Sequence, residues 1–453
     1  MKKIILILGS LALMSTAAQA QWVAQPIGFE DPEYTVVSGL KVIDNNVAWA
    51  ATSNIDDTDG SLLPGYEYAR TTDGGATWTT TEISALTIDE YSLGIFGVDA
   101  NTAYVTVKDF TSGSSRIIKT TDGGTTWATS FTFSSQASIP VIVGFFNTNE
   151  GVCIGYPTTI NGPFEIYTTS NAGVSWTRAT NVPASLTPSS SSIEYVASVK
   201  PVVAGNSIWF VTGKNRIYYS SDKGKTWNVS APTSTNPLQG LAFQDANNGL
   251  VIGLNAQNTS HTLLRTTDGG ATWNNVSYTG PLHGYDISRV PGNGNYISVG
   301  VNIGSNTSNN KDAGSSYSQD NGQTWIPLES TRNHIIVDAA SPTAIWTGAF
   351  GPGVYKLNTT VLSTRQDAVL QRSLHVFPNP SADGQFTVQL GSGLRSAAQV
   401  SVLDALGRSV YSQTVPAAAN PNLAINLAQQ AAGIYTLRVS SASGVAQQKL
   451  LLK

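Results

Sequence analysis

An eight-residue phrase that occurs six times limits the fold of this chain more than any other feature of its 453 residues. The first copy reads Thr71-Thr72-Asp73-Gly74-Gly75-Ala76-Thr77-Trp78, and the third residues of successive copies lie 49, 49, 51, 46 and 52 positions apart. A period of about fifty residues indicates a repeat of four short strands, which is one blade of a β-propeller. The third and last residues of the six copies are Asp73 and Trp78, Asp122 and Trp127, Asn171 and Trp176, Asp222 and Trp227, Asp268 and Trp273, and Asp320 and Trp325.

Each residue type in the phrase suits a tight turn between two strands. The Ser or Thr hydroxyl and the Asp carboxylate accept backbone N–H bonds inside the turn. The glycine at the fifth position, Gly75 in the first copy, supplies a positive φ, and the Trp buries a large ring beside the blade core. A carboxylate that recurs on the same turn in copy after copy is predicted to be structural and not a catalytic acid.

The phrase resembles the Asp-box, or BNR, repeat of sialidases, sortilin-type receptors and the photosystem II assembly factor propellers, and it does so in register throughout. In those families the boxes lie on outer hairpins, away from the face that meets ligands. The resemblance therefore implies an all-β propeller in which the boxes are scaffold and recognition is sought across the ring from them.

The number of blades is predicted to be seven. Each box follows a pair of expected strands, and a seventh pair, 334–338 and 344–348, leads to a third strand, 353–357, but to no box. The segment 22–27 looks like the strand that follows a box, with no box before it. We expect this N-terminal strand to complete the seventh blade, because closure leaves no open sheet edge. Six blades with a separate strand is the alternative.

The start of the chain predicts export. A basic end, an apolar stretch and Ala18-Gln19-Ala20 indicate a signal peptide over residues 1–20. No later stretch reaches the roughly 18 apolar residues that a membrane span needs. The whole chain has 25 basic and 29 acidic residues, a balance that does not suggest a nucleic-acid surface. The propeller is assigned to residues 21–358.

The rest of the chain follows a different pattern. Residues 359–373 show neither the blade pattern nor an apolar period and are predicted to be a linker. Residues 374–453 contain about seven expected short strands, which suggests a small Ig-like β-sandwich. This tail resembles the type A C-terminal sorting domain of the type IX secretion system, with matching positions at Pro378, Asn379, Pro380, Gly433, Tyr435, Lys449 and Lys453.

The resemblance of the tail implies export in two steps. The signal peptide takes the chain to the periplasm, and the type IX machinery then recognises the tail. In that family the cargo is released or attached to surface lipopolysaccharide, so the expected location is outside a Gram-negative cell or on its outer-membrane surface. An ordinary adhesive Ig-like module is the alternative.

Candidate ligand-binding residues stand near the expected starts of inner strands, opposite the boxes. Aromatic rings at the mouth of a central channel suit a sugar or a protein partner. The competing interpretation is that Tyr favours strand ends and charged residues favour loops. The candidates are Tyr34, Tyr91, Tyr195, Tyr285, His334, Arg289 and Arg332.

A sialidase-like, exo-acting glycoside hydrolase is the alternative function. Such a site needs three arginines around the substrate carboxylate, a tyrosine nucleophile and a separate acid. The propeller has few arginines, and Arg70 and Arg265 lie directly beside boxes. No catalytic residue is assigned, and we expect a non-catalytic protein that binds a glycan or another protein.

Neither a metal nor a cofactor is expected. The acidic loop at 54–60 does not follow the EF-hand order, because Ile55 stands at the first ligand position. The histidines show no metal-ligand spacing along the chain; they are His261, His283, His334 and His375.

Overall fold

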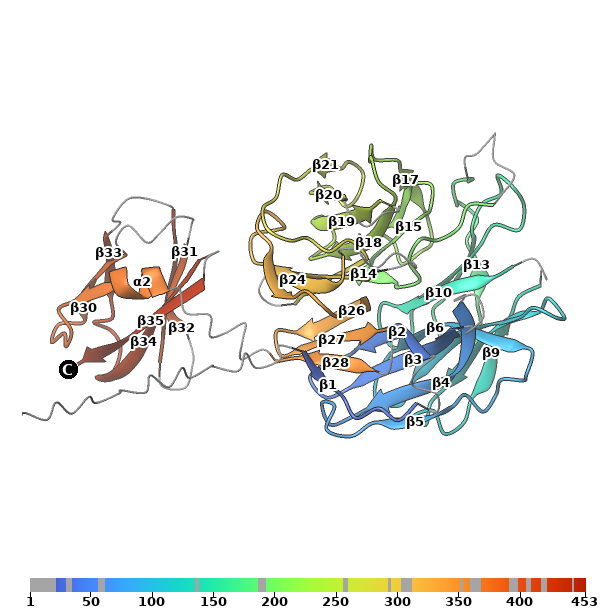
Figure 1. Cartoon of the computed structure of the whole chain (residues 1–453), viewed down its shortest axis with the longest axis horizontal. Helices are drawn as coiled ribbons and strands as arrows, with labels where there is room; N and C mark the ends of the chain where they lie inside the picture. The colour runs from blue at the N-terminus through green and yellow to red at the C-terminus, as the bar shows by residue number, and fades with distance from the viewer. Residues whose placement is uncertain are drawn as a thin grey trace, which may run out of the picture.

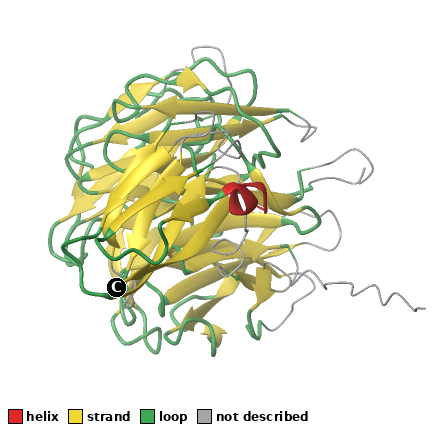
Figure 2. Ribbon diagram, turned by 90° about the vertical axis from the view of Figure 1, so that its left-hand side faces the viewer, coloured by secondary structure: helices red, strands yellow, loops and turns green. Residues whose placement is uncertain are grey.

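Strands make up almost all of the regular structure (Figures 1 and 2). The predicted signal peptide, most of the acidic loop and the first part of the expected linker lie outside the described residues. The computed structural model describes residues 22–29, 35–55, 62–134, 138–185, 193–255, 260–291, 295–302, 312–350, 353–358, 368–390, 398–404, 409–416, 422–441 and 444–453.

Seven antiparallel blades of four strands form the propeller. Blades three to seven are separate sheets, whereas blades one and two share one sheet because Gly65 and Ser92 form a bridge between them. The Ser92 hydroxyl also donates to the Gly65 carbonyl at 2.8 Å. The first strands contact one another in six of the seven pairs of neighbouring blades, so the first strand of each blade is the inner one.

In blades one to six the strands follow one another outward in chain order, and in blade seven the N-terminal strand takes the outermost place. The inner strands are β2 (Thr35–Val42), β6 (Glu90–Gly97), β10 (Pro140–Phe145), β14 (Val202–Ala204), β18 (Leu238–Phe243), β22 (Asp286–Val290) and β26 (His334–Ser341). The second strands are β3 (Ala48–Ile55), β7 (Ala103–Asp109), β11 (Gly151–Gly155), β15 (Ser207–Val211), β19 (Gly249–Leu254), β23 (Asn295–Gly300) and β27 (Ala344–Ala349). The third strands are β4 (Leu62–Thr71), β8 (Ser115–Thr120), β12 (Glu165–Thr169), β16 (Ile217–Ser220), β20 (His261–Thr266), β24 (Gly314–Ser318) and β28 (Val354–Leu357). The outer strands are β5 (Thr79–Glu82), β9 (Ala128–Thr132), β13 (Thr177–Arg178), β17 (Asn228–Ser230), β21 (Asn274–Asn275), β25 (Ile326–Glu329) and β1 (Trp22–Ala24).

The N-terminal strand closes the ring, which confirms the prediction. β1 pairs antiparallel with β28, with Trp22 opposite Leu357 and Ala24 opposite Tyr355. The Trp22 indole is 3% exposed, and its N–H donates to the Ser315 hydroxyl in blade six at 2.8 Å. The seventh blade thus takes its outer strand from the other end of the chain, so that hydrogen bonds between the two ends close the ring.

The boxes form one and the same turn. In the first copy the Thr71 hydroxyl accepts the N–H of Gly75 at 3.0 Å, and the Asp73 carboxylate accepts the N–H and the hydroxyl of Thr77 at 2.9 and 2.6 Å. In the third copy Asn171 keeps these bonds, because its amide oxygen accepts the N–H of Ser175 at 2.9 Å and its amide N–H donates to the Ser175 hydroxyl.

The turn needs two consecutive residues with positive φ. The fifth-position glycine adopts it, as predicted, with φ of 92° at Gly75. The fourth residue also adopts it, which the sequence analysis missed because that position is not always glycine: φ is 56° at Ala172, 64° at Lys223 and 57° at Asn321. A residue with a side chain is strained in this region, so something outside the residue must stabilise the turn.

The carbonyl of the fourth residue also joins the box to the preceding blade. Side chains from that blade donate to it, namely Lys356 to Gly74 at 2.7 Å, Tyr68 to Gly123 at 3.4 Å, Tyr104 to Ala172 at 2.8 Å and Trp209 to Gly269 at 2.7 Å. The box tryptophans pack across the same boundary: the ring of Trp78 lies 5.2 Å from Trp346 of blade seven, and that of Trp127 lies 5.6 Å from Tyr68 of blade one. These four boxes are therefore joints between blades as well as hairpins.

The C-terminal domain packs two sheets around one apolar core, as expected of a small Ig-like sandwich. One sheet has the order β29 (His375–Phe377), β30 (Gln385–Gln389) and β33 (Asn422–Asn426). The other has the order β32 (Ser409–Val415), β31 (Ala398–Leu403), β34 (Gly433–Ser441) and β35 (Gly444–Leu452). The expected linker, 359–373, needs correction: its last part is the helix α2 (Ala368–Ser373), and Leu370 of that helix is fully buried in the C-terminal core.

The strained fourth position predicts opposite effects for two matched substitutions. Ala172→Gly relieves the left-handed strain and is expected to raise the free energy of unfolding of the propeller by roughly 1 kcal/mol or less. Gly123→Ala introduces the strain and is expected to lower it by about the same amount. A Cβ at Gly123 would lie 2.7 Å from the end of the flexible Arg70 side chain, which can move away. Denaturant unfolding followed by Trp fluorescence measures both, and shifts of the same sign would contradict the argument.

The box carboxylates predict how stability changes in acid. The hydroxyl bond from Thr77, followed by its backbone bond, lowers the pKa of Asp73 to about 2, and Thr126 does the same for Asp122. A folded-state pKa below the unfolded one contributes stability that is present above about pH 4 and is lost as the pH falls toward 2.

The matched variant is Asp73→Asn with Asp122→Asn, which copies the natural Asn171. Its melting temperature should fall less than that of the wild type between about pH 4 and pH 2, because the amides do not titrate there. Thermal unfolding across this range, with pH 7 as the reference, checks the prediction. Equal losses in the two proteins would show that the source of acid sensitivity lies elsewhere.

Candidate functional site: the channel and the rim face

The two faces of the ring carry different features. Five of the six boxes donate a backbone N–H to the turn that joins the first two strands of their own blade: the N–H of Gly74 donates to the carbonyl of Asn46 and that of Gly123 to the carbonyl of Asn101, both at 2.9 Å. Inner strands therefore end at this face, here called the box face, and begin at the opposite face, here called the rim face.

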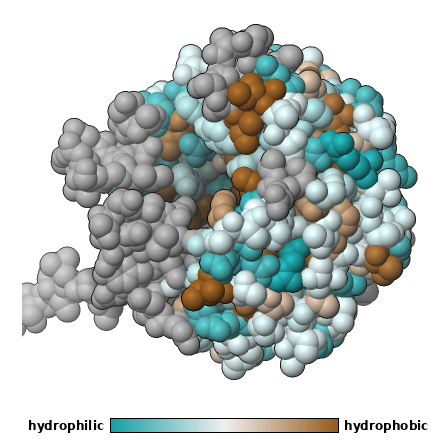
Figure 3. All heavy atoms as spheres, turned by 90° about the vertical axis from the view of Figure 1, so that its right-hand side faces the viewer, coloured by the Kyte–Doolittle hydropathy of each residue, from teal (hydrophilic) through white to brown (hydrophobic). Residues whose placement is uncertain are grey.

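Three cavities follow one another along the channel between the inner strands. The cavity at the rim face has a volume of about 290 Å³ and is lined by Val36, Tyr285 and other residues near the starts of the strands. A narrow middle cavity has about 30 Å³. The cavity at the box face has about 210 Å³ and is bordered by rings such as Phe96 and Phe243. No box residue lines any of the three. Figure 3 shows the surface hollowed near the middle of one face.

Lys200 lies across the channel and lines all three cavities. Its ammonium lies 2.7 Å from both carboxylate oxygens of Asp286 and donates to the carbonyl of Val337 at 3.1 Å. Lys200 comes from blade four, Asp286 from blade six and Val337 from blade seven. Burial raises the pKa of Asp286 while the ammonium of Lys200 opposes that rise. The ion pair thus ties three blades together in the middle of the channel.

The structure separates the candidates that the sequence grouped. Tyr91 and Tyr195 lie at the rim face, and Tyr195 is 51% exposed. Tyr285 lines the rim-face cavity. Arg289 lines the box-face cavity instead, because the strand carries it toward the other end of the channel. Tyr34 lies outside the described residues.

His334 and Arg332 help to hold the closing strand. His334 is fully buried, which corrects its expected place at the channel mouth; its Nε2 lies 2.8 Å from Glu329, and its ring lies 5.2 Å from that of Trp22. Burial keeps the pKa of His334 below its usual value, although the bond to Glu329 raises it. The Arg332 guanidinium lies 4.2 Å from the Tyr355 ring of β28.

Several exposed apolar side chains lie at the rim face of blades two to four. Ile88 precedes β6 and is 86% exposed, Phe110 follows β7 and is 56% exposed, and Ile160 lies between β11 and β12 and is 50% exposed. The ring of Phe110 lies 5.4 Å from that of Tyr91. We define the rim patch as Ile88, Tyr91, Phe110, Ile160 and Tyr195.

The sequence analysis found two members of the rim patch, Tyr91 and Tyr195, and missed three. A single apolar residue in a loop is ordinary on a protein surface, so Ile88, Phe110 and Ile160 carried no signal one at a time. A usable signal was that all three interrupt polar connections on the same side of consecutive repeats.

The paired arginines near the rim face are bound within single blades. Arg116 contacts both carboxylate oxygens of Glu90 at 2.7 and 2.6 Å in blade two, and Arg216 contacts Glu194 at 2.8 Å in blade four. A sialidase-like clamp needs three arginines that converge on one cavity. Among the described residues that line the channel cavities, Arg289 is the one arginine.

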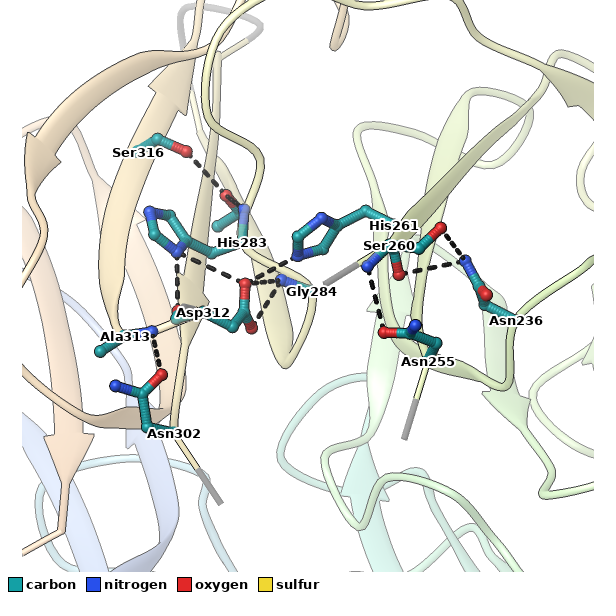
Figure 4. Close-up of polar contacts among 11 residues, drawn as sticks. Asn236, Asn255, Ser260, His261, His283, Gly284, Asn302, Asp312, Ala313 and Ser316 are labelled. Carbon is teal, nitrogen blue, oxygen red and sulfur yellow. Dashed lines mark hydrogen bonds and ion pairs between the residues drawn. The ribbon is translucent and has the colours of Figure 1, made fainter. Parts of the chain in front are cut away.

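Asp312 connects blades five and six at the rim face (Figure 4). Its side chain is 1% exposed, accepts the N–H of Gly284 at 3.2 and 3.1 Å, and lies 2.7 Å from Nε2 of His261. Nδ1 of His283 lies 2.8 Å from the backbone carbonyl oxygen of Asp312. Sequence spacing missed this cluster because its members come from different blades. Within the ranges that the structure describes, no group of three or more His, Cys, Asp or Glu is arranged to hold a metal ion.

Two family models match parts of the chain. The model described as "Secretion system C-terminal sorting domain" matches residues 375–453, and the model described as "Sortilin, neurotensin receptor 3" matches residues 164–280. A search of curated proteins gives no match. Among the helices of the described part of the chain, none is long and apolar enough to cross a membrane.

The comparison with solved structures gives matches at low sequence identity. YCF48 from Cyanidioschyzon merolae has a TM-score of 0.54 at 17% identity, covering 75% of this chain and 99% of that chain. YCF48 bound to D1 peptide has a TM-score of 0.50 at 16% identity, covering 74% and 95%. The GH74 enzyme of Niastella koreensis has a TM-score of 0.43 at 12% identity, covering 95% and 80%.

The propeller and the C-terminal domain are similar to different groups of proteins. The box-built ring is similar to sortilin and to the photosystem II assembly factors in its repeats and its fold. Because residues 375–453 match the sorting-domain model, the chain is a cargo of the type IX secretion system that reaches the cell surface or the outside, and what it carries there is an Asp-box β-propeller.

Proposed function

We propose that the exported propeller binds another protein through the rim patch and catalyses no reaction. One observation carries the proposal: Ile88, Phe110, Ile160 and Tyr195 are each half exposed or more and lie on one face of three consecutive blades. Apolar side chains gathered on one face mark interaction sites. The two isoleucines favour a protein over a sugar, because sugar hydroxyls need polar partners.

The loop that carries Phe110 is held in place before any partner binds. The ammonium of Lys108, which is nearly buried, donates to the carbonyls of Gly113 at 2.6 Å and Ser138 at 3.3 Å. The Asp109 carboxylate accepts backbone N–H bonds from the same loop, each at 2.8 Å. A preorganised loop loses little conformational entropy on binding, which supports a display role for this face.

The glycoside hydrolase alternative has less support. Glu90 and Glu194, the glutamates at the rim ends of blades two and four, are bound to arginines of their own blades. A carboxyl group acting as general acid needs a raised pKa, whereas the Arg116 guanidinium and a backbone bond keep the pKa of Glu90 lowered against the effect of its burial. One structural relative was solved with a bound peptide, so a ring of this kind can hold a polypeptide.

The rim patch predicts the effect of two exposed substitutions. Phe110→Ser with Tyr195→Ser should weaken saturable binding of the mature full chain to the producing cells by about tenfold or more, because exposed aromatic residues dominate interface energies. The matched control is Val174→Ser, since Val174 is 80% exposed but lies in a box, on the opposite face. Binding of labelled protein to whole cells measures both variants.

Treatment of the cells identifies the partner class. Loss of binding after protease treatment supports a protein, and loss after periodate oxidation alone points to a glycan and contradicts the choice made here. Equal binding by the aromatic variant and the Val174→Ser control would remove the rim patch from consideration. Turnover of sialosides or polysaccharides by the wild type would favour the hydrolase.

The sorting domain predicts where a truncated chain stops. Without residues 374–453 and with the signal peptide intact, the propeller is expected to accumulate in the periplasm, because the type IX machinery has no tail to recognise. Cell fractionation measures its location, and protease resistance of the periplasmic product controls for folding. Arrival of the truncated chain at the surface would mean that the export signal lies outside the tail.

A further inference from the structure

β35 is an edge strand of nine residues in the C-terminal domain. Its one neighbour in the sheet is β34, so the N–H and C=O groups of alternate residues point away from the sheet. Long edges of this kind are places where two protein chains pair, and proteins cover them or place charges on them.

Groups from residues 371–381 satisfy this edge in the place of a strand. The side-chain amide of Gln371 accepts the N–H and donates to the C=O of Gln447, at 2.9 and 3.0 Å. The side-chain amide of Asn379 donates to the C=O of Lys449 at 2.7 Å and accepts the N–H of Leu451 at 2.9 Å.

The backbone of Ser381 completes the row. Its N–H donates to the C=O of Leu451, and its C=O accepts the N–H of Lys453, both at 2.9 Å. Six outward backbone groups between Gln447 and Lys453 are therefore bonded, and four of the six bonds come from two side-chain amides.

Side chains make these bonds because the local backbone lacks donors. Pro378 and Pro380, on either side of Asn379, have no N–H, so this segment is unable to pair as a regular strand. A carboxamide offers one acceptor and two N–H donors in a geometry close to that of a peptide group. Asn379 therefore supplies the pairing that its proline neighbours do not.

The partner that fits the uncovered edge is the same strand of a second copy. An antiparallel pair of identical edges has two-fold symmetry and satisfies both edges at once. Ile434 and Leu451 lie opposite each other on the exposed face of β34 and β35, at 58% and 39% exposure, and a paired copy would add apolar cover. Lys449 on this strand and Lys453 directly after it add positive charge, which opposes pairing of two copies.

We propose that Gln371 and Asn379 are edge clamps, which keep the sorting domain monomeric by closing β35 against the β35 of a second copy. Asn379 then acts inside the domain as a positioning residue. The inference concerns the C-terminal domain alone and does not depend on what the propeller binds.

The test is the oligomeric state of the mature full chain with Gln371→Ala and Asn379→Ala. The double variant should form dimers or larger species as its concentration rises, as seen by sedimentation velocity, while the wild type stays monomeric. Hydrogen exchange at Gln447 and Leu451 in the dilute variant should accelerate by about five- to tenfold, the effect of one lost hydrogen bond.

Two further variants separate edge pairing from unfolding. Gln399→Ala removes an exposed amide that bonds Ser412 and Thr414 elsewhere in the same sheet, and it should stay monomeric. Leu451→Lys, added to the double variant, puts a third charge on the edge and should restore the monomer.

Three outcomes would overturn the proposal: a double variant that stays monomeric, unchanged exchange at Gln447 and Leu451, or association that the added lysine does not reverse. The last of these would mean that the domain has unfolded and not that its edge has paired.

Discussion

The hydrogen bonds inside the box turn are the interaction on which the propeller depends. They hold two consecutive residues at positive φ, including Ala172 and Lys223, which disfavour that conformation. All of them join residues no more than four apart, so each turn forms without help from distant parts of the chain. This conformation turns the fourth carbonyl outward, and in four of the six boxes a side chain of the preceding blade donates to it. Local bonding thus sets the contact between neighbours, and the repeat of that contact builds a ring.

The sequence predicted those parts of the molecule that rest on local rules. The boxes, the ring closed by β1 and the two-sheet tail follow from turn chemistry, strand alternation and a missing repeat unit. It did not predict contacts that depend on how blades meet. Lys200 contacts Asp286 two blades away, and Asp312 of the sixth blade contacts His261 of the fifth. The spacing of these residues along the chain does not predict either contact. Arg289 was placed at the wrong mouth because a strand position was treated as a strand start.

Because an ion pair occupies the centre of the ring, we expect recognition to take place on the outer surface of the propeller. Lys200 and Asp286 fill the middle of the channel and bond to a third blade, so the channel serves cohesion as well as space. Ionised side chains that are nearly buried need such partners, and replacing one would leave the other uncompensated. The loops above this centre differ from blade to blade, whereas the boxes beneath it repeat. Variation on one face and repetition on the other is the division expected when one face carries recognition.

Both domains solve the same problem by different means. A β-sheet ends in unpaired backbone groups, and a protein that is carried across two membranes meets many chains that might pair with them. The propeller keeps only short outer edges and joins its two ends within one blade, since Trp22 pairs with Leu357. An Ig-like sandwich does not close in this way, and its last strand needs cover from elsewhere. Asn379 and Gln371 provide that cover. Both residues belong to the segment that leads into the domain, so the edge of β35 is covered once this segment has docked against it. On this view Asn379, the asparagine between two prolines in the sorting sequence, serves first to stabilise the fold of the C-terminal domain.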